Sequence, residues 1–568
     1  MGYKETYEEW KRQDNLDDDL KVELDSLTDE GDIEDRFYEF LSFGTAGMRG
    51  KLGVGTNRMN NVMVARATYG FAKQMLDEST ANADKGVAIS YDSRIKSDEF
   101  AKTAACVLAA QGIHSYLYES LRPTPMLSFA VRYLGCAGGI MITASHNPAE
   151  YNGYKVYGND GAQLANEAAD AVVDVIDNID NYFDIPKMDY KEALAKGLIE
   201  IIGKDVDEAY IKEVENVVHM DQKSDLVIVY TPLHGTGNIP VRRVLADMGF
   251  DKVYVVPEQE KPDGNFPTVE FPNPEYKEVF NLAIPLAEKV GADLILGTDP
   301  DGDRVGVVNK NSDGEYVVFT GNQTGALLVD YMLKTRPEFP ANKAVIKTIV
   351  TSELGAVIAR AHGAEPIDVL TGFKYIGEHI TNWQKTHEHT FVMGYEESYG
   401  YLAGEYARDK DAVVASALVC EMAAYYKDLG KTLYDALQDL YKEYGFFQEG
   451  IQSYAFEGVD GKDKMAKLMD VFRDHQIKSF GDEKLITVND YKDSESLDVA
   501  TDKETKIDLP SSNVLKFIYD KNSWFALRPS GTEPKLKIYF STTGATKADA
   551  EKKMDELVSV VDKVKEEN

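Results

Sequence analysis

Three apolar runs in this chain stop abruptly at polar loops, and this recurring pattern restricts the folds that the chain can adopt. The loops read TASHNP (143–148), GTDPDGDR (297–304) and GYEESYG (394–400). Helical patterns, such as EFAKTAACVLAAQG at 99–112, separate the runs. This alternation is typical of βα units with a largely parallel sheet. We therefore expect each loop at the carboxyl end of a strand, where open α/β sheets bind ligands.

The length of the chain and its change of character near residue 444 predict four domains. At 568 residues the chain is long enough for roughly four domains of ~150 residues. The polar segment 490–512 predicts a loop, whereas 513–544 predicts antiparallel strands and 547–567 a charged helix. The predicted fold class is α/β: three α/β domains with mixed, largely parallel sheets at 1–205, 206–320 and 321–445, then a C-terminal α+β domain at 446–568.

The charge balance argues against some classes of partner. The chain has 96 acidic and 62 basic residues, and its formal net charge is −34 at pH 7. A field of this sign repels polyphosphate, so we expect neither a nucleic acid nor an anionic membrane as a partner. A small anionic substrate is compatible with this charge only where basic side chains gather locally.

Cysteine usage and hydropathy predict a cytoplasmic protein. The three cysteines are odd in number and widely spaced, which indicates neither a disulfide framework nor a cysteine metal site. The first 20 residues are charged throughout and lack the apolar stretch of a signal peptide. No segment approaches the ~20 uninterrupted apolar residues of a membrane span.

The loop GTDPDGDR predicts a metal site. Asp299, Asp301 and Asp303 alternate, so the backbone can aim all three carboxylates at one point. Such a cluster repels itself unless a cation is present, and oxygen ligands suit Mg²⁺. An EF-hand is excluded, because Arg304 stands where its glycine belongs and Lys310 where its glutamate belongs. Arg304 could instead neutralise a phosphate beside the metal.

Ser145, at the end of the first apolar run, is a candidate nucleophile. It does not lie in a G-x-S-x-G elbow, and His146 beside it is not expected to turn its imidazole back towards it. A serine that accepts a phosphoryl group fits the other loops, since DPDGDR supplies a cation and Lys155 can handle protons or charge. Phosphoryl transfer needs little beyond positioning and charge neutralisation.

Two basic loops are suited to anions. RPSGTEPKLK (528–537) combines an arginine, hydroxyl side chains and a turn whose N–H groups can cradle an anion, although an ordinary hairpin turn has the same composition. FGTAGMRGKLGVGTNRMN (43–60) is rich in glycine and contains Arg49 and Arg58. Its spacing fits neither a P-loop nor a dinucleotide site.

Two further polar segments carry side chains that can bind a sugar or a metal. GYEESYG offers Glu396 and Ser398 to adjacent sugar hydroxyls, although a capped turn looks similar. His387 and His389 lack an evident third ligand, so this pair predicts a surface loop rather than a zinc site.

Taken together, these motifs resemble those of the α-D-phosphohexomutases. TASHNP with YNGYK, DPDGDR, GYEES and RPSGTEP occur in the order and spacing of that family, over nearly the whole chain. FGTAGMRG and the length look most like the branch with bacterial α-phosphoglucomutases and animal phosphopentomutases. The resemblance implies four domains around a central cleft. It also implies an enzyme, monomeric or a small homo-oligomer, that interconverts glucose 1-phosphate and glucose 6-phosphate.

The resemblance further implies a role for each motif residue. Ser145 would be carried as phosphoserine, and Mg²⁺ would be held by the three aspartates and a phosphoserine oxygen. The phosphoryl group would pass to the sugar phosphate, giving a glucose 1,6-bisphosphate intermediate that also primes the enzyme. The implied residues are, for catalysis, Ser145, Lys155, Arg49 and His146; for the metal, Asp299, Asp301 and Asp303; for sugar orientation and hydroxyls, Thr371, Gly372, Lys374, Glu396 and Ser398; and for phosphate, Arg304, Lys410, Arg528, Ser530, Gly531 and Thr532.

The choice of sugar rests on small departures from the family pattern. Tyr399 before Gly400 is near the Phe form of hexose enzymes, which favours glucose. A separate departure concerns the phosphate loop, where Lys535 and Lys537 stand at a point where an arginine often follows. A lysine supplies charge but not the bidentate fork of an arginine, so the hold on phosphate is expected to differ. The alternatives are a phosphopentomutase or phosphomannomutase with the same mechanism, or a catalytically silent sugar-phosphate-binding protein. The presence of the serine, the three aspartates and the lysine argues against a catalytically silent binding protein, because binding alone needs no nucleophile. The many loops expected to bind the substrate suggest that the site closes and excludes water from the phosphoserine, which disfavours a phosphatase.

Overall fold

The computed structural model describes residues 2–44, 47–220, 224–456, 461–474, 477–530 and 535–566. The chain forms two compact units. The first unit consists of Met1–Thr324 and Phe373–Leu433, and the second unit consists of Gly325–Gly372 and Tyr434–Asn568. The four domain boundaries expected from the sequence remain predictions.

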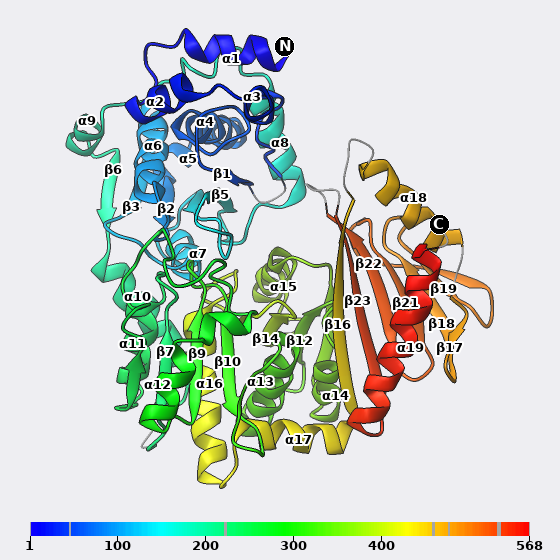
Figure 1. Ribbon diagram of the computed structural model, residues 1–568. Coiled ribbons are helices and arrows are strands. Elements are labelled where there is room, and N and C mark those ends of the chain that lie inside the picture. Colours follow the sequence, from blue (N-terminus) through cyan, green and yellow to red (C-terminus); the bar gives the residue numbers. More distant parts are fainter. Residues whose placement is uncertain are drawn as a thin grey trace. The chain divides into compact units, whose positions relative to one another are not determined.

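A six-stranded sheet with the strand order β1-β5-β4-β2-β3-β6 opens the first unit (Figure 1). β4, β2, β3 and β6 are parallel to one another. At one edge, β5 pairs antiparallel with β4, and β1 pairs antiparallel with β5. All of β4 is buried, which explains its uninterrupted apolar sequence. The strands are β1 (Gly47–Lys51), β2 (Val87–Tyr91), β3 (Ser115–Tyr118), β4 (Gly138–Ile142), β5 (Tyr151–Gly158) and β6 (Ile199–Ile202).

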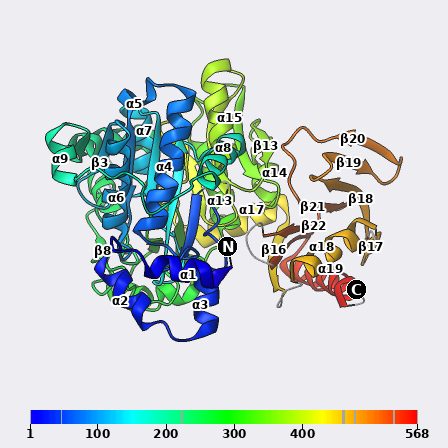
Figure 2. The same ribbon diagram turned by 90° about the horizontal axis from the view of Figure 1, so that it is seen from above.

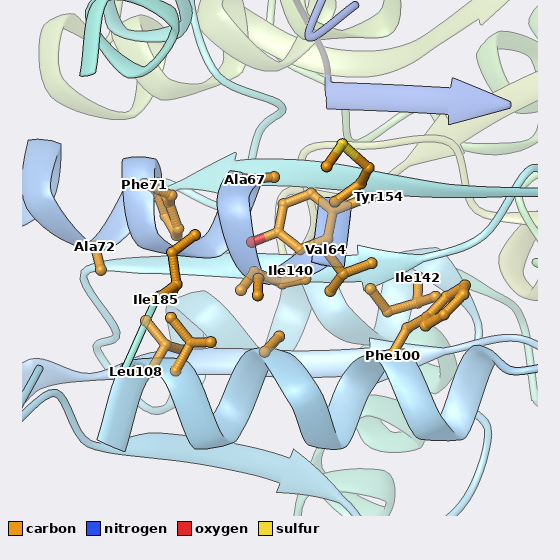
Figure 3. Packing of buried hydrophobic residues seen from close by; sticks show 14 of the residues in the cluster. Val64, Ala67, Phe71, Ala72, Phe100, Leu108, Ile140, Ile142, Tyr154 and Ile185 are labelled. Carbon is orange, nitrogen blue, oxygen red and sulfur yellow. The ribbon is translucent and has the colours of Figure 1, made fainter. Parts of the chain in front are cut away.

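Helices bury the apolar side chains of this sheet (Figure 3). Phe71 on α4 and Leu108 on α6 belong to the same buried cluster as Ile140 of β4. α4 begins after Asn60, whose side-chain Oδ1 accepts hydrogen bonds from two N–H groups of the first turn. The helices of this region are α4 (Asn61–Glu78), α5 (Asn82–Lys85), α6 (Ser97–Ala110), α7 (Thr124–Tyr133), α8 (Asn166–Asp177), α9 (Tyr190–Ala195) and α10 (Lys204–Val217).

Three short helices precede the sheet: α1 (Tyr3–Lys11), α2 (Asp18–Ser26) and α3 (Glu30–Phe37). They lie together on the first unit in both views (Figures 1 and 2). Trp10 is fully buried, and its ring centre lies 5.9 Å from that of Phe37 and 5.2 Å from that of Phe183. This aromatic cluster fastens the charged N-terminal helices to the rest of the unit.

Trp10→Ala is therefore expected to lower the thermal unfolding midpoint of the first unit by at least about 5 °C, because a large cavity opens among buried rings. Differential scanning calorimetry measures the shift. Tyr254→Ala, at a strand position where the ring is 42 % exposed, should change the midpoint by less than about 2 °C. Equal shifts in the two variants would contradict a structural role for the Trp10 cluster.

A second, five-stranded sheet follows in the first unit, with the order β11-β10-β9-β7-β8. β9 runs parallel to β7 and antiparallel to β10, so residues 299–304 form the connection between β9 and β10. The elements are β7 (Ile228–Thr231), α11 (Asn238–Asp247), β8 (Val253–Val255), a 3₁₀ helix (Lys277–Phe280), α12 (Ala283–Val290), β9 (Leu294–Thr298), β10 (Val305–Lys310) and β11 (Tyr316–Val318).

The segment that returns to the first unit contains a hairpin and two helices. β14 (Thr390–Glu396) pairs antiparallel with β15 (Gly400–Ala403), between α15 (Phe373–Thr386) and α16 (Ala412–Asp428). Asp411 caps α16 by accepting hydrogen bonds from Val413 N and Val414 N at 2.8 and 3.1 Å. α16 is apolar nearly all round because almost all of its residues are buried.

The second unit contains a parallel strand pair and an antiparallel sheet. β12 (Lys343–Thr348) pairs parallel with β13 (Glu365–Val369). The antiparallel sheet has the order β16-β23-β22-β21-β18-β19-β20, with β17 paired to β18. Its strands are β16 (Phe446–Ala455), β17 (Ser479–Phe480), β18 (Glu483–Asp490), β19 (Glu495–Asp498), β20 (Lys503–Lys506), β21 (Leu515–Tyr519), β22 (Trp524–Pro529) and β23 (Lys535–Gly544).

Helices complete the chain, and α14 (Leu354–Ala361), α18 (Gly461–Asp474) and α19 (Lys547–Glu566) belong to the second unit. α13 (Gly321–Thr335) and α17 (Leu433–Tyr444) span the points where the chain passes from the first unit to the second. In the part of the chain that the structure describes, no helix combines the length and apolar character that a membrane crossing requires.

The predicted fold class is confirmed, whereas the separate prediction of a loop at 490–512 is wrong. Mixed α/β sheets and a C-terminal α+β part are present, and the strands expected within 513–544 are found. The segment 490–512, predicted to be a loop, contains the strands β19 and β20. Every residue of β20 is exposed, so this strand carries no apolar alternation that could reveal it in the sequence.

Candidate active site

Ser145 follows β4 in an unusual backbone conformation. Its φ of +52° lies in the left-handed region, which residues other than glycine seldom adopt, and the residue is 3 % exposed. Its N–H donates to Thr143 Oγ1 at 2.7 Å, and its Oγ donates to Asp299 Oδ2 at 3.0 Å. The serine hydroxyl of the first sheet thus meets the aspartate loop of the second.

His146 corrects one expectation from the sequence. Its Nδ1 lies 3.2 Å from Ser145 Oγ, so the imidazole does turn back towards the serine. In an extended strand adjacent side chains point apart, but the left-handed turn at Ser145 removes that alternation. Burial, with the positive charges of Arg304 and Arg49, lowers the pKa of His146 well below its usual value. The ring is therefore neutral near pH 7.

Asp299, Asp301 and Asp303 form a buried cluster. One carboxylate oxygen from each lies within 4.8 Å of the others, and none of the three residues is more than 2 % exposed. Burial, followed by the charges of Asp301 and Asp303, raises the pKa of Asp299 well above its usual value. Oδ1 of Asp301 and Oδ1 of Asp303 are buried without a hydrogen-bond partner. An all-oxygen set with free buried oxygens fits Mg²⁺.

Two lysines balance these carboxylates. Lys155 Nζ, from β5, lies 2.8 Å from Asp301 Oδ2 and 3.7 Å from Asp303 Oδ2. Lys410 Nζ lies 3.2 Å from Asp303 Oδ2 and 3.1 Å from Asp409 Oδ1. Burial acts to lower the pKa of each lysine, but the carboxylates outweigh it and raise both pKa values. Both side chains are therefore cationic.

Arg304 lies at the edge of the cluster rather than free in solvent. Its Nη1 donates to Glu275 Oε1 at 2.5 Å, and its backbone N–H donates to Asp299 Oδ1 at 3.0 Å. Burial opposes its charge, but Glu275 and Asp303 together raise its pKa. Its guanidinium therefore remains charged beside the aspartates, as a phosphate-binding role would require.

The loop GYEESYG joins the same site. Glu396 ends β14 and is 6 % exposed, while Ser398 is half-buried in the following turn. Val305 N donates to Tyr399 O at 3.1 Å, which ties this turn to the strand that follows the aspartates. A Cβ added to Gly400 would lie 2.0 Å from Lys410 Cδ, so the absence of a side chain there makes room for the lysine.

The remaining sequence candidates of the first unit lie further out. Arg49 is exposed, and its Nη1 donates to Asn147 Oδ1 in the serine loop at 2.9 Å. Lys374 is half-buried at the start of α15, and its Nζ donates to Asn166 Oδ1 at 2.6 Å. Arg58, which the sequence also singled out, bonds the Asp35 carboxylate and is held in the N-terminal segment.

Other candidates belong to the second unit or lie outside the described residues. Thr371 and Gly372 are the last residues of the segment Gly325–Gly372, which belongs to the second unit. Arg528 lies near the end of β22, and Ser530 directly follows that strand. Ser530 N donates to Lys535 O at 2.7 Å across the loop. Gly531 and Thr532 lie outside the described residues. Within the described ranges, His387 and His389 belong to no group of potential metal ligands.

Sequence reasoning missed several buried residues that support the site. Asp409 accepts hydrogen bonds from Tyr157 OH at 2.8 Å and Gln163 Nε2 at 3.1 Å, and it also pairs with Lys410. Arg94, in the loop after β2, donates to the backbone of the serine loop. The signal available for Arg94 was its position in YDSR, directly after an apolar run, at the same sheet edge as Ser145.

Comparison with known proteins covers most of the chain. The models of phosphoglucomutase/phosphomannomutase alpha/beta/alpha domains I, II and III match residues 41–183, 208–314 and 320–444, and that of the C-terminal domain matches 480–558.

Several curated relatives are named phosphoglucomutase. That of Staphylococcus epidermidis is 39 % identical over 93 % of this chain and 95 % of its own length. That of Staphylococcus aureus is 40 % identical over 90 % and 92 %. A solved phosphoglucomutase/phosphomannomutase family protein from Burkholderia thailandensis, 19 % identical, covers 92 % of this chain and 97 % of its own, with a TM-score of 0.67.

Proposed function

Because this chain belongs to the phosphoglucomutase/phosphomannomutase family and is a phosphosugar mutase, we propose that it interconverts α-D-glucose 1-phosphate and D-glucose 6-phosphate by way of a phosphorylated Ser145. Phosphoglucomutase activity follows from the curated relatives of that name, which cover about nine-tenths of the chain. The proposed part is the chemistry at Ser145 and the role of each residue around it.

The observation that carries the proposal is the 3.0 Å hydrogen bond between Ser145 Oγ and Asp299 Oδ2. It joins a buried hydroxyl to a cluster of three carboxylates and two ammonium groups. A protein that only binds sugar phosphates needs no hydroxyl at this point. Phosphoryl transfer does need one, together with fixed charges around the transferred group.

The three aspartates and a phosphoserine oxygen would hold Mg²⁺, which when bound supplies charge neutralisation to the phosphoryl group. The protein's own groups complete this environment. Lys155 is held protonated by Asp301 and Asp303, so it presents a fixed positive charge beside Ser145. Lys410 adds a second fixed positive charge, 3.2 Å from Asp303 Oδ2, and is proposed to bind phosphate. Such preorganised charges cost no reorganisation when negative charge moves between oxygens.

The Oγ proton has two acceptors within reach when Ser145 takes up a phosphoryl group. Asp299 Oδ2 lies 3.0 Å away, and His146 Nδ1 lies 3.2 Å away and accepts a hydrogen bond in the tautomer protonated on Nε2.

The other residues have proposed roles in binding the substrate. Glu396 and Ser398, on the hairpin of β14 and β15, bind sugar hydroxyls, and Arg49 stabilises charge beside the serine loop. Arg304 neutralises a phosphate beside the metal site. Arg528, Ser530, Gly531 and Thr532 of the C-terminal loop bind the phosphate that does not react. Thr371, Gly372 and Lys374 orient the sugar.

Activity on three sugar phosphates tests the proposal. With Mg²⁺ and trace glucose 1,6-bisphosphate, kcat/KM for glucose 1-phosphate should exceed that for ribose 1-phosphate and mannose 1-phosphate by at least about tenfold, which corresponds to about 1.4 kcal/mol. Product formation is followed by ion-exchange chromatography of the sugar phosphates. A dominant pentose or mannose activity would leave the mechanism in place but contradict the glucose assignment.

The same assay separates the remaining classes. Release of inorganic phosphate without an isomeric product would indicate a phosphatase, and absence of turnover would indicate a binding protein. Glucose 1,6-bisphosphate should act as intermediate and activator, because it restores phosphoserine to dephosphorylated enzyme. We further propose that the protein works in the cytoplasm, as a monomer or a small homo-oligomer, with small-molecule sugar phosphates and neither nucleic acid nor membranes as partners.

A further inference from the structure

One arginine outside the motifs of the proposed mechanism holds the backbone of the serine loop. Arg94 Nη2 donates to Ser145 O at 2.6 Å and to Asn147 O at 2.5 Å. Its Nη1 donates to Pro148 O at 2.8 Å and to Tyr151 O at 2.9 Å. A single guanidinium therefore fixes four carbonyl oxygens within the seven residues from the nucleophile to the start of β5.

The backbone that Arg94 holds is strained. Ser145 has a φ of +52°, and a residue with a Cβ in the left-handed region persists only where its surroundings enforce it. The Ser145 carbonyl is one of the four that Arg94 binds, so the guanidinium acts directly on the strained residue. The orientation of Ser145 Oγ towards Asp299 depends on that same backbone turn.

Arg94 is itself held on both sides. Its side chain is fully buried, and its Nε lies 3.3 Å from Asp92 Oδ2. Asp92 Oδ1 accepts hydrogen bonds from Arg94 N at 2.9 Å and Ser97 Oγ at 2.7 Å. On the other side, the Phe266 ring centre lies 4.9 Å from the guanidinium carbon. Phe266 lies in the connection between β8 and the 3₁₀ helix, so Arg94 contacts both the serine loop and the chain of the second sheet.

We propose that Arg94 is a positioning residue for phosphoryl transfer: it holds Ser145 in the left-handed conformation that aims Oγ at the aspartate cluster. This inference rests on the proposed phosphoserine at Ser145. Arg94 touches no substrate and acts only through the serine loop. Its effect should therefore fall on the chemical step and leave substrate affinity nearly unchanged.

Arginine is required at this position because of its shape. A lysine keeps the charge, but one ammonium group cannot reach four carbonyl oxygens that the planar guanidinium binds in two pairs. A methionine fills similar space and keeps none of the hydrogen bonds. The two variants thus separate the charge, the hydrogen-bonding geometry and the packing.

The test compares steady-state kinetics of Arg94→Met and Arg94→Lys. Arg94→Met is expected to lower kcat by about 100-fold with KM for glucose 1-phosphate within about threefold, because a small misplacement of a reacting atom has effects of this size. Arg94→Lys should fall between Arg94→Met and the unaltered protein. Phosphorylation of Ser145 by glucose 1,6-bisphosphate, timed by intact-protein mass spectrometry, should slow in proportion to kcat.

Arg66→Met is the matched control. Arg66, on α4, is also buried, and it donates to the carbonyl of Ile176 on α8 at 3.2 Å and pairs with Asp177 rather than with the serine loop. This variant reports what loss of a buried arginine does to the thermal midpoint and to kcat. Equal kcat in the Arg66 and Arg94 variants would overturn the proposal, as would a rise in KM without a loss of kcat in Arg94→Lys.

The outcome is distinguishable from failure of the proposed function. If Ser145 of the unaltered protein takes up no phosphoryl group from glucose 1,6-bisphosphate, the phosphoserine assignment fails and the role of Arg94 fails with it. If Ser145 is phosphorylated at the same rate in the unaltered protein and in Arg94→Lys, only the Arg94 inference fails. Should Arg94→Met not fold, Arg94→Lys alone decides between these results.

Discussion

Ser145→Ala is expected to abolish turnover, lowering kcat with glucose 1-phosphate by at least about 10⁴-fold. The substitution removes Oγ, the atom to which we assign the phosphoryl group, but keeps the backbone N–H and carbonyl that contact Thr143 and Arg94. Folding should therefore persist. Glucose 6-phosphate formation, measured by coupled reduction of NADP⁺ with glucose 1,6-bisphosphate present, gives the rate.

Ser90→Ala provides the matched control for this experiment. Ser90 is a buried serine on β2 whose Oγ donates to Arg122 O at 3.0 Å, so its loss also removes one buried hydroxyl. We expect kcat of this variant to stay within roughly threefold of the unaltered value, since the lost hydrogen bond affects stability rather than chemistry. Substantial mutase turnover by Ser145→Ala would refute the phosphoserine.

Removal of divalent cations is expected to lower activity by at least about 100-fold, and Mg²⁺ should restore it. Three carboxylates whose oxygens lie within 4.8 Å repel one another, and two of their oxygens have no hydrogen-bond partner. A cation that binds this folded cluster also stabilises the fold by mass action. The thermal midpoint of the chelated protein should therefore rise when Mg²⁺ is added, in the absence of any substrate.

Asp301→Asn tests whether this cluster is where the cation binds. The variant should need a higher Mg²⁺ concentration for the same rise in midpoint, and its kcat should fall by about 100-fold or more at saturating sugar. Asp293→Asn alters an aspartate outside the cluster, which accepts a hydrogen bond from Val227 N at 2.8 Å and pairs with Lys427. Full activity in verified metal-free protein would contradict the site.

The parts of the site that follow from strand ends could be predicted from the sequence. A short apolar run bounded by turn residues, such as 138–142, favours a buried strand, and this places Ser145 at a sheet edge. The alternation of the three aspartates likewise predicts their convergence. The family resemblance supplied the link between these two loops, which the structure displays as the bond between Ser145 and Asp299.

The supporting contacts could not be predicted in this way. Arg94 bonds backbone carbonyls, and carbonyls are present in every loop regardless of sequence. The orientation of His146 depends on the φ of the preceding residue, which no local preference of serine indicates. The exposed strand β20 is specified by its pairing with β19, since hydrophobic burial leaves no pattern in the residues of β20.

The pairing of Asp303 with Lys155 and Lys410 has a consequence for synthesis of the chain. Asp303 lies between its two partners in sequence, and one of them is encoded 107 residues later. A growing chain that has not yet reached residue 410 must bring three acidic groups together with only part of their balancing charge. The ion pair between Asp303 and Lys410 therefore forms only after the segment that returns to the first unit has been synthesised, and Lys410 adds its charge to the cluster late.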